Sequence, residues 1–249
     1  MKINDVLNAV NELAPFDSAC EWDNCGLMCG DRYADLTNAL VTLDADMHAL
    51  EQAKSNGCTL VISHHPLIFD GLRSVTADTP VYRFIREGIA VISAHTCLDA
   101  AKDGINDLLA AYAGIQNPEP LMMDGCALGR YGCVSAEEPE LYIDMLKENL
   151  PSCRADCVIS RPIERAAVVS GSGGSALPLL SRYGCDTLIT GEAKHNHFVY
   201  AENNGLNLLT FGHFETENII VNPLAKRLSE MLPDINFVIS DRTEFIRRR

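Results

Sequence analysis

The chain has 249 residues, 47% of them hydrophobic and 22% charged, and its 34 acidic and 20 basic residues give a net charge of −14. This size and composition are typical of a globular protein built from one large domain or two small ones. The acidic balance argues against a general binder of nucleic-acid phosphates, and no apolar run approaches the ~18 residues of a membrane helix.

The N-terminus lacks the apolar core of a signal peptide, so we expect a cytoplasmic protein. None of the ten cysteines forms a C-x-x-C pair. We therefore expect reduced, mostly buried thiols and not a disulfide scaffold.

The first half of the chain alternates between helical and strand patterns. Apolar residues at helical spacing predict a helix over 2–14, with Asn4 as its N-cap. The elements expected after it are strand 38–43, helix 45–56, strand 58–63, helix 78–87, strand 89–93 and helix 104–113. Short, continuously apolar strands between helices predict an α/β fold, with the sheet covered on both faces.

Residues 114–135 are rich in glycine and proline, and we interpret them as the boundary region between two lobes. The expected domains are 1–124 and 125–249, with the segment 206–217 returning to a shared site. The second half predicts helix 137–149, strands 166–170, 186–190 and 206–211, helix 216–232 and strand 235–240.

The two halves echo each other weakly. In each, a glycine closes a helix, a strand follows, and the strand runs into a histidine with a carboxylate four residues later. These pairs are His95/Asp99 and His213/Glu217. The repetition indicates two related lobes.

Metal-competent side chains follow several predicted strands. His64 and His65 come after 58–63, and the two histidine–carboxylate pairs come after 89–93 and 206–211. Ligands of open α/β sheets bind beyond the carboxyl ends of the strands, where parallel neighbours converge. Imidazole and carboxylate suit divalent Zn, Fe or Mn. Two adjacent histidines point in different directions and could serve two ions, so we predict a metal site in which His95 is a partner or substrate contact.

Other motifs are weaker. The glycine-rich turn 170–175 could hold an anion, although a tight strand–helix turn is the simpler interpretation. His195 lies either near the site or at a solvated helix start, as does His197, for which the second interpretation is favoured. We interpret His48 as a satisfied surface residue and the basic end 247–249 as a solvated tail.

Short stretches spread over nearly the whole chain carry a family resemblance. They are EWDNCGLMCG (21–30), SHHPLIF (63–69), AHTCLD (94–99) followed by GIND (104–107), GEAKH (191–195) and GHFETE (212–217). In this order they resemble the NIF3 family, NGG1-interacting factor 3-like proteins also known as GTP cyclohydrolase 1 type 2 homologues. Together they are highly specific, whereas any one of them alone is not.

The resemblance implies two α/β lobes with a dinuclear metal centre between them, built into a toroidal homohexamer. His95 matches a histidine near the metals, and Glu217 matches a carboxylate that bridges them. The residues that match the family's metal ligands are His64, His65, Asp99, His213 and Glu217.

Three functions compete at this point. The first is a hydrolase that uses two divalent ions on a nucleotide-like or other small cyclic substrate, with His95 or His195 shuttling a proton. The second is a non-catalytic metal-binding or protein-interaction assembly, since nothing in the sequence reads a purine base or a triphosphate. The third, a nucleic-acid clamp or nuclease, is disfavoured by the net charge of −14.

Overall fold

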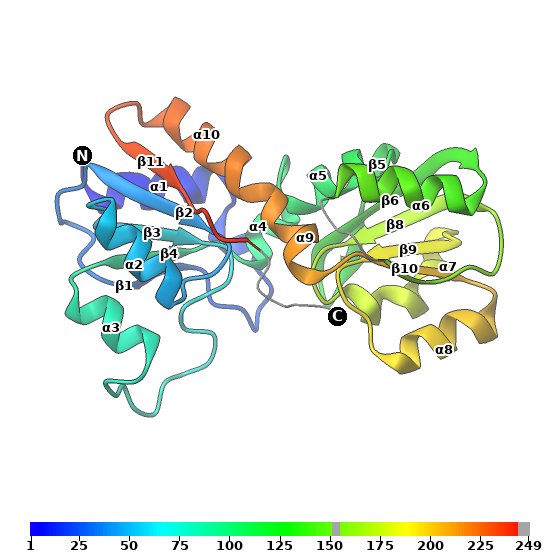
Figure 1. Cartoon of the computed structure of the whole chain (residues 1–249), viewed down its shortest axis with the longest axis horizontal. Helices are drawn as coiled ribbons and strands as arrows, with labels where there is room; N and C mark the ends of the chain where they lie inside the picture. Colours follow the sequence, from blue (N-terminus) through cyan, green and yellow to red (C-terminus); the bar gives the residue numbers. More distant parts are fainter. Residues whose placement is uncertain (151–154, 244–249) are drawn as a thin grey trace. The chain divides into compact units, whose positions relative to one another are not determined.

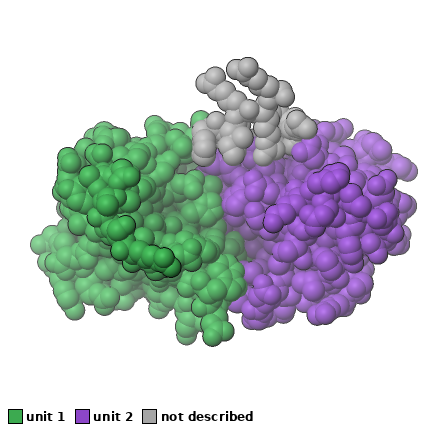
Figure 2. All heavy atoms as spheres, turned by 90° about the horizontal axis from the view of Figure 1, so that it is seen from below, with its two compact units in different colours: residues 1–101, 220–249 green, residues 102–219 purple. Residues whose placement is uncertain are grey.

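The structure, a computed structural model, describes residues 1–150 and 155–243, and these form two compact units (Figures 1 and 2). Unit 1 combines residues 1–101 with the C-terminal segment from residue 220, and unit 2 is residues 102–219. Cys153 and the basic end 247–249 lie outside the described residues. No helix among the described residues is long and apolar enough to cross a membrane.

Unit 1 is built on a five-stranded sheet with the order β1-β4-β3-β2-β11. Neighbours from β4 to β11 are parallel, and β1 pairs with β4 in the antiparallel sense. The strands are β1 (Gly26–Cys29), β2 (Asn38–Thr42), β3 (Leu60–Ser63), β4 (Ala90–Ser93) and β11 (Asn236–Ile239). The helices are α1 (Ile3–Leu13), α2 (Met47–Ser55), α3 (Pro80–Arg86), α4 (Thr96–Ala100) and α10 (Val221–Met231), with the 3-10 turn η1 (Phe16–Ser18).

The core of unit 1 explains why its central strands are apolar at every position. Every residue of β3 and β4 is buried. Leu40, Val61 and Val91 pack against α2 and against Phe84 of α3. Neighbouring residues of the same strands face the other side and are also buried, which confirms a sheet covered on both faces.

The division into units differs from the boundary expected after residue 124. The cause lies in the C-terminal strand: β11 pairs in parallel with β2, with Phe237 opposite Ala39. The last segment of the chain therefore completes the first sheet, whereas α5 (Ile105–Tyr112) contacts β6 and β8 of the second.

Unit 2 is built on a six-stranded sheet with the order β5-β6-β8-β9-β10-β7, in which β8, β9 and β10 are parallel. The strands are β5 (Gln116–Met123), β6 (Cys126–Glu137), β7 (Asp156–Val158), β8 (Ile163–Val169), β9 (Thr187–Thr190) and β10 (Asn207–Thr210). The remaining helices are α6 (Pro139–Asn149), α7 (Leu180–Tyr183), α8 (His195–Asn204) and α9 (His213–Glu217), with the 3-10 turns η2 (Gly173–Leu179) and η3 (Asn218–Ile220).

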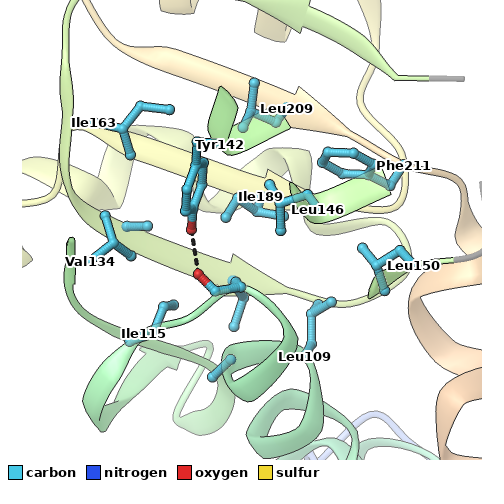
Figure 3. Close-up of a cluster of buried hydrophobic side chains, with 14 of the residues drawn as sticks. Leu109, Ile115, Val134, Tyr142, Leu146, Leu150, Ile163, Ile189, Leu209 and Phe211 are labelled. Atoms are coloured by element: carbon cyan, nitrogen blue, oxygen red, sulfur yellow. Dashed lines mark hydrogen bonds between the residues drawn. The ribbon is translucent and has the colours of Figure 1, made fainter. Parts of the chain in front are cut away.

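One core cluster of unit 2 joins α5 and α6 to the sheet (Figure 3). Leu109 and Leu146 pack there with Ile189 and Phe211, and all four are fully buried. Tyr142 reaches across the cluster and donates a hydrogen bond from its hydroxyl to the carbonyl oxygen of Ala113 at 2.6 Å.

The glycine- and proline-rich stretch 114–135 is a β-hairpin and not an irregular boundary. Asp124 and Gly125 form its turn with φ of 49° and 82°, and Asp-Gly is a favoured pair in tight hairpins because both positions need a positive φ. Pro118 and Pro120 lie in β5, an edge strand, where missing backbone donors are tolerated.

Two predicted helices also differ from the structure. Helix α1 begins at Ile3 and not after Asn4, because the backbone N–H of Lys2 donates to Asp5 Oδ2 at 2.7 Å and closes the first turn there. The helix expected over 216–232 is interrupted by η3 between α9 and α10. Pro223, in the first turn of α10, has no N–H to continue the hydrogen bonds of a helix that began earlier.

Candidate metal centre

Three histidines of unit 1 meet beyond the ends of two neighbouring parallel strands. His64 and His65 follow β3, His95 follows β4, and one ring nitrogen from each lies within 4.8 Å of the others. The ring centroids of His64 lie 4.9 Å from His65 and 5.0 Å from His95. Parallel register brings the strand ends together, as the sequence predicted, and we call these residues the three-histidine group.

Fixed acceptors hold the paired histidines in one tautomer. The carbonyl oxygen of Ala94 lies 3.0 Å from Nδ1 of His64, and Asp44 Oδ1 lies 2.7 Å from Nδ1 of His65. Because both oxygens can only accept, each Nδ1 carries a proton, and Nε2 has the lone pair whenever the ring is neutral. Histidines that bind metals are generally oriented in this way.

The third histidine has a carboxylate partner as well, from the loop before β1. Asp23 Oδ1 lies 2.9 Å from Nδ1 of His95, and the Asp23 side chain is fully shielded from solvent. The other oxygen, Oδ2, accepts hydrogen bonds from the backbone N–H and the hydroxyl of Thr96. Burial by itself raises the pKa of Asp23, but the hydrogen bonds from His95 and Thr96 and the charge of His95 hold it well below its usual range.

Sequence reasoning missed Asp23 and Asp44. Asp44 follows β2, the strand next to β3, so the strand-end argument that selected the histidines could have included it. Asp23 lies within the conspicuous stretch 21–30, but its partner is 72 residues away, and spacing gave no sign of the pair.

Asp99 occupies the position expected for a ligand that follows β4. His95 caps the five-residue helix α4, and Asp99 is buried one turn later. It lies outside the three-histidine group as defined by the 4.8 Å separation of ligand atoms.

In unit 2 the predicted residues His213 and Glu217 lie on one face of the short helix α9. His213 Nε2 is 3.0 Å from Glu217 Oε2, and Nδ1 is 3.2 Å from Glu192 Oε2. Carboxylate oxygens therefore face both ring nitrogens, whereas a neutral imidazole has only one N–H to donate. A protonated imidazole satisfies both contacts with its two N–H groups, and a neutral one does so when Nε2 and Oε2 hold a cation together, so the His213–Glu217 pair is compatible with a metal.

Gly171 makes room for this pair. A Cβ atom at residue 171 would lie 2.0 Å from Glu217 Oε1 and 3.1 Å from His213 Nε2. The backbone of the glycine-rich turn therefore lies too close to the pair for any side chain at residue 171. The φ of +57° at Gly171 also favours glycine.

Three amides of the same turn are used internally. The N–H groups of Ser170, Gly171 and Gly173 donate to Asn106 Oδ1, Thr216 Oγ1 and Thr190 Oγ1. The simpler interpretation, a tight strand–helix turn, agrees with these contacts.

The remaining predicted histidines lie in plainer surroundings. His195 is the first residue of α8 and is exposed. His197 accepts a hydrogen bond at Nδ1 from the backbone N–H of Lys194 at 3.2 Å, which caps α8. His48 is paired with Asp241 at the surface, as expected.

Two aromatic side chains border the three-histidine group. Trp22 and Phe69 are 51% and 47% exposed, and their rings lie 5.9 Å apart. Each meets the imidazole of His95 edge to face, at 6.4 Å for Trp22 and 6.0 Å for Phe69. Single exposed apolar side chains are normal, whereas exposed ones that lie together form a patch of the kind found at binding surfaces.

Relatives cover the whole chain. A protein named GTP cyclohydrolase 1 type 2 homolog from Clostridium perfringens is 33% identical, over 99% of this chain and 100% of its own length. Among solved structures, reduced HcgD from Methanocaldococcus jannaschii has a TM-score of 0.87 at 28% identity, covering 97% of this chain and 98% of its own. A hypothetical protein from Staphylococcus aureus has a TM-score of 0.88 at 26% identity, covering 99% of both chains.

A family model described as Duf34/NIF3 (NGG1p interacting factor 3) matches residues 1–244. The matched span contains the three-histidine group, the His213–Glu217 pair and both sheets. The chain therefore belongs to the DUF34/NIF3 family.

Proposed function

We propose that this protein is a metal-dependent hydrolase that acts on a nucleotide-like or other small cyclic substrate. The observation that carries the proposal is the three-histidine group, in which fixed acceptors leave Nε2 of His64 and of His65 able to coordinate. The proposed site holds two divalent ions, and its ligands are His64, His65, Asp99, His213 and Glu217.

The donor set fits such ions. Neutral imidazole nitrogen and carboxylate oxygen suit Zn, Fe or Mn. In the proposed site the His213–Glu217 pair would hold the ions together with the histidines of unit 1, and the two oxygens of Glu217 would suit a shared ligand. When bound, two such ions polarise a substrate oxygen and activate a water.

The chain's own residues orient the substrate and move protons. Asp23 fixes His95 with its proton on Nδ1, so that Nε2 is the atom that accepts a proton from water or returns one to a leaving group. His195, exposed at the start of α8, is the proposed second proton carrier.

The aromatic pair supports a planar cyclic substrate. Trp22 and Phe69 come from different loops, yet the rings of both lie beside the imidazole of His95. Planar heterocycles stack on the faces of aromatic rings with about 1–3 kcal/mol per ring. A ring held there lies next to the proposed acid–base group.

A second candidate function is a non-catalytic metal-binding or protein-interaction assembly. It is favoured by the backbone of the glycine-rich turn, because the amides of Ser170, Gly171 and Gly173 donate within unit 2 and are not available to a substrate phosphate. For both candidates we propose a cytoplasmic homo-oligomer, a toroidal hexamer, with no membrane contact and no nucleic-acid partner.

Elemental analysis of protein purified without a metal-affinity tag tests the proposal. We expect about two ions per chain in the parent and almost none in a His64→Ala, Glu217→Ala double variant. The metal found is then supplied in a hydrolysis screen against nucleotides and cyclic amides or esters. Metal without any turnover favours the second candidate. No metal even after reconstitution overturns the hydrolase and leaves, of the second candidate, only the protein-interaction assembly.

A further inference from the structure

Two cysteines of unit 1 are in direct contact next to the three-histidine group. The Sγ of Cys97 lies 3.5 Å from the Sγ of Cys25 and donates its hydrogen to it. Cys25 also accepts the backbone N–H of His95 at 3.4 Å and donates to Asp23 Oδ2 at 3.3 Å. Two thiols at this distance need to approach by only about 1.5 Å to form a disulfide bond.

The sheet holds this contact in place. Cys25 directly precedes β1, Cys97 lies in α4 just after β4, and Gly26 of β1 is paired with Ser93 of β4. A second tie comes from the backbone N–H of Cys20, which donates to Thr96 Oγ1 at 3.0 Å. The two segments are therefore fixed against each other, although the cysteines are 72 residues apart.

The two thiols differ in access to solvent. Cys25 is partly exposed, whereas Cys97 is fully buried. A small oxidant in solution therefore reaches Cys25 first, and Cys97 is the thiol in direct contact with it that can resolve the product. An accessible thiol beside a buried resolving thiol is the usual arrangement of a reversible redox site.

We propose that Cys25 and Cys97 form a redox modification site that a hydroperoxide converts to a disulfide. The Cys25 sulfur attacks the peroxide, takes one oxygen to become a sulfenic acid and releases water, or an alcohol from an organic hydroperoxide. The Cys97 sulfur then attacks the sulfenic sulfur, and the second oxygen leaves as water. Overall two thiols lose two electrons and two protons, and one peroxide bond is reduced.

The disulfide acts on the site through Asp23. Its formation removes the hydrogen that Cys25 donates to Asp23 Oδ2, and it draws the loop toward α4. Asp23 positions His95, so the imidazole shifts when the thiols are oxidised. The effect on bound metal rests on the proposed function, whereas the disulfide and the movement of His95 do not.

Peroxide treatment of the reduced, full-length protein, followed by peptide mapping, tests the modification. We expect a cross-linked peptide joining Cys25 and Cys97, a loss of about 2 Da and reversal by dithiothreitol. In Cys97→Ser we expect a sulfenic acid trapped at Cys25 by dimedone. Cys29→Ser, which removes the thiol at the end of β1, should leave the cross-link intact. Cross-linking of Cys25 to another cysteine, or oxidation confined to the exposed Cys133 and Cys157, overturns the proposal.

Imidazole resonances of His95, compared between reduced and oxidised protein without added metal, test the coupling. We expect a shift that is absent in Cys97→Ser, and unchanged resonances overturn the coupling. With Mn²⁺ or Zn²⁺ as the probe, the oxidised form should bind at least about tenfold more weakly. If neither form binds metal, the proposed function fails, while the cross-link and the resonance shift still decide this inference.

Discussion

Asp23 Oδ1 and His95 Nδ1 are 2.9 Å apart, and this contact ties a loop near the N-terminus to the end of β4. The aspartate also accepts two hydrogen bonds from Thr96, so a single buried carboxylate fixes both the imidazole and the start of α4. When a carboxylate accepts the N–H of a histidine near a metal site, it fixes the tautomer and the orientation of the imidazole ring.

Replacing this carboxylate tests its positioning role. Asp23→Asn keeps the shape, but its amide nitrogen cannot accept a hydrogen bond, so in either orientation the contact with His95 or the contact with Thr96 is lost. We expect metal affinity to fall about 10–100-fold, measured by titration calorimetry. The control is Asp17→Asn, an exposed position in η1, which should change nothing. Equal affinities in the two variants would show that Asp23 matters for folding alone.

The close contact of Gly171 with the His213–Glu217 pair can be tested by comparing alanine substitutions at two glycines. In Gly171→Ala the new methyl group collides with the Glu217 carboxylate, whereas in Gly184→Ala it meets open space. Both positions have a positive φ, +57° and +64°, so both variants carry backbone strain of about 1 kcal/mol or more. Only Gly171→Ala should also lose bound metal, as measured by elemental analysis. Similar metal content in both variants would show that the His213–Glu217 pair does not hold the metal.

The sequence predicted the parts of the site that follow from strand order. His64, His65 and His95 were placed together because neighbouring parallel strands end at one edge, and β3 and β4 do pair in this way. Local turn chemistry was misread, since Asp124–Gly125 is a hairpin signal inside a stretch interpreted as a boundary. Contacts such as Asp23 with His95 had no local signal, because tertiary packing alone brings them together.

The hydroxyl of Tyr142 offers a stability test within the core of unit 2 (Figure 3). Tyr142→Phe leaves the carbonyl of Ala113 without this buried donor while the ring still packs. We expect a loss of about 1–2 kcal/mol in the free energy of unfolding, measured by urea denaturation. Tyr112→Phe, at the edge of the same cluster, should cost less than about 0.5 kcal/mol. If Tyr142→Phe lowers the free energy of unfolding by no more than Tyr112→Phe does, the hydrogen bond contributes little to the stability of the folded state.

One half-buried thiol and one buried thiol, those of Cys29 and Cys185, make stability depend on alkaline pH. Burial raises the pKa of Cys29, and likewise that of Cys185, from 9.0 to about 11. Between these values the folded protein keeps both protons while the unfolded chain loses them. The unfolded state then binds fewer protons, so the free energy of unfolding falls as pH rises from 9.0 toward 11.

Urea midpoints measured across this pH window test the effect. In a Cys29→Ala, Cys185→Ala double variant the decline with pH should be shallower than in the parent, because lysines and tyrosines titrate equally in both. Cys133→Ala, which removes an exposed thiol, should decline like the parent. Parallel declines in the parent and the double variant would mean that neither thiol keeps its proton on folding, and that burial at these two positions is too slight to hold it.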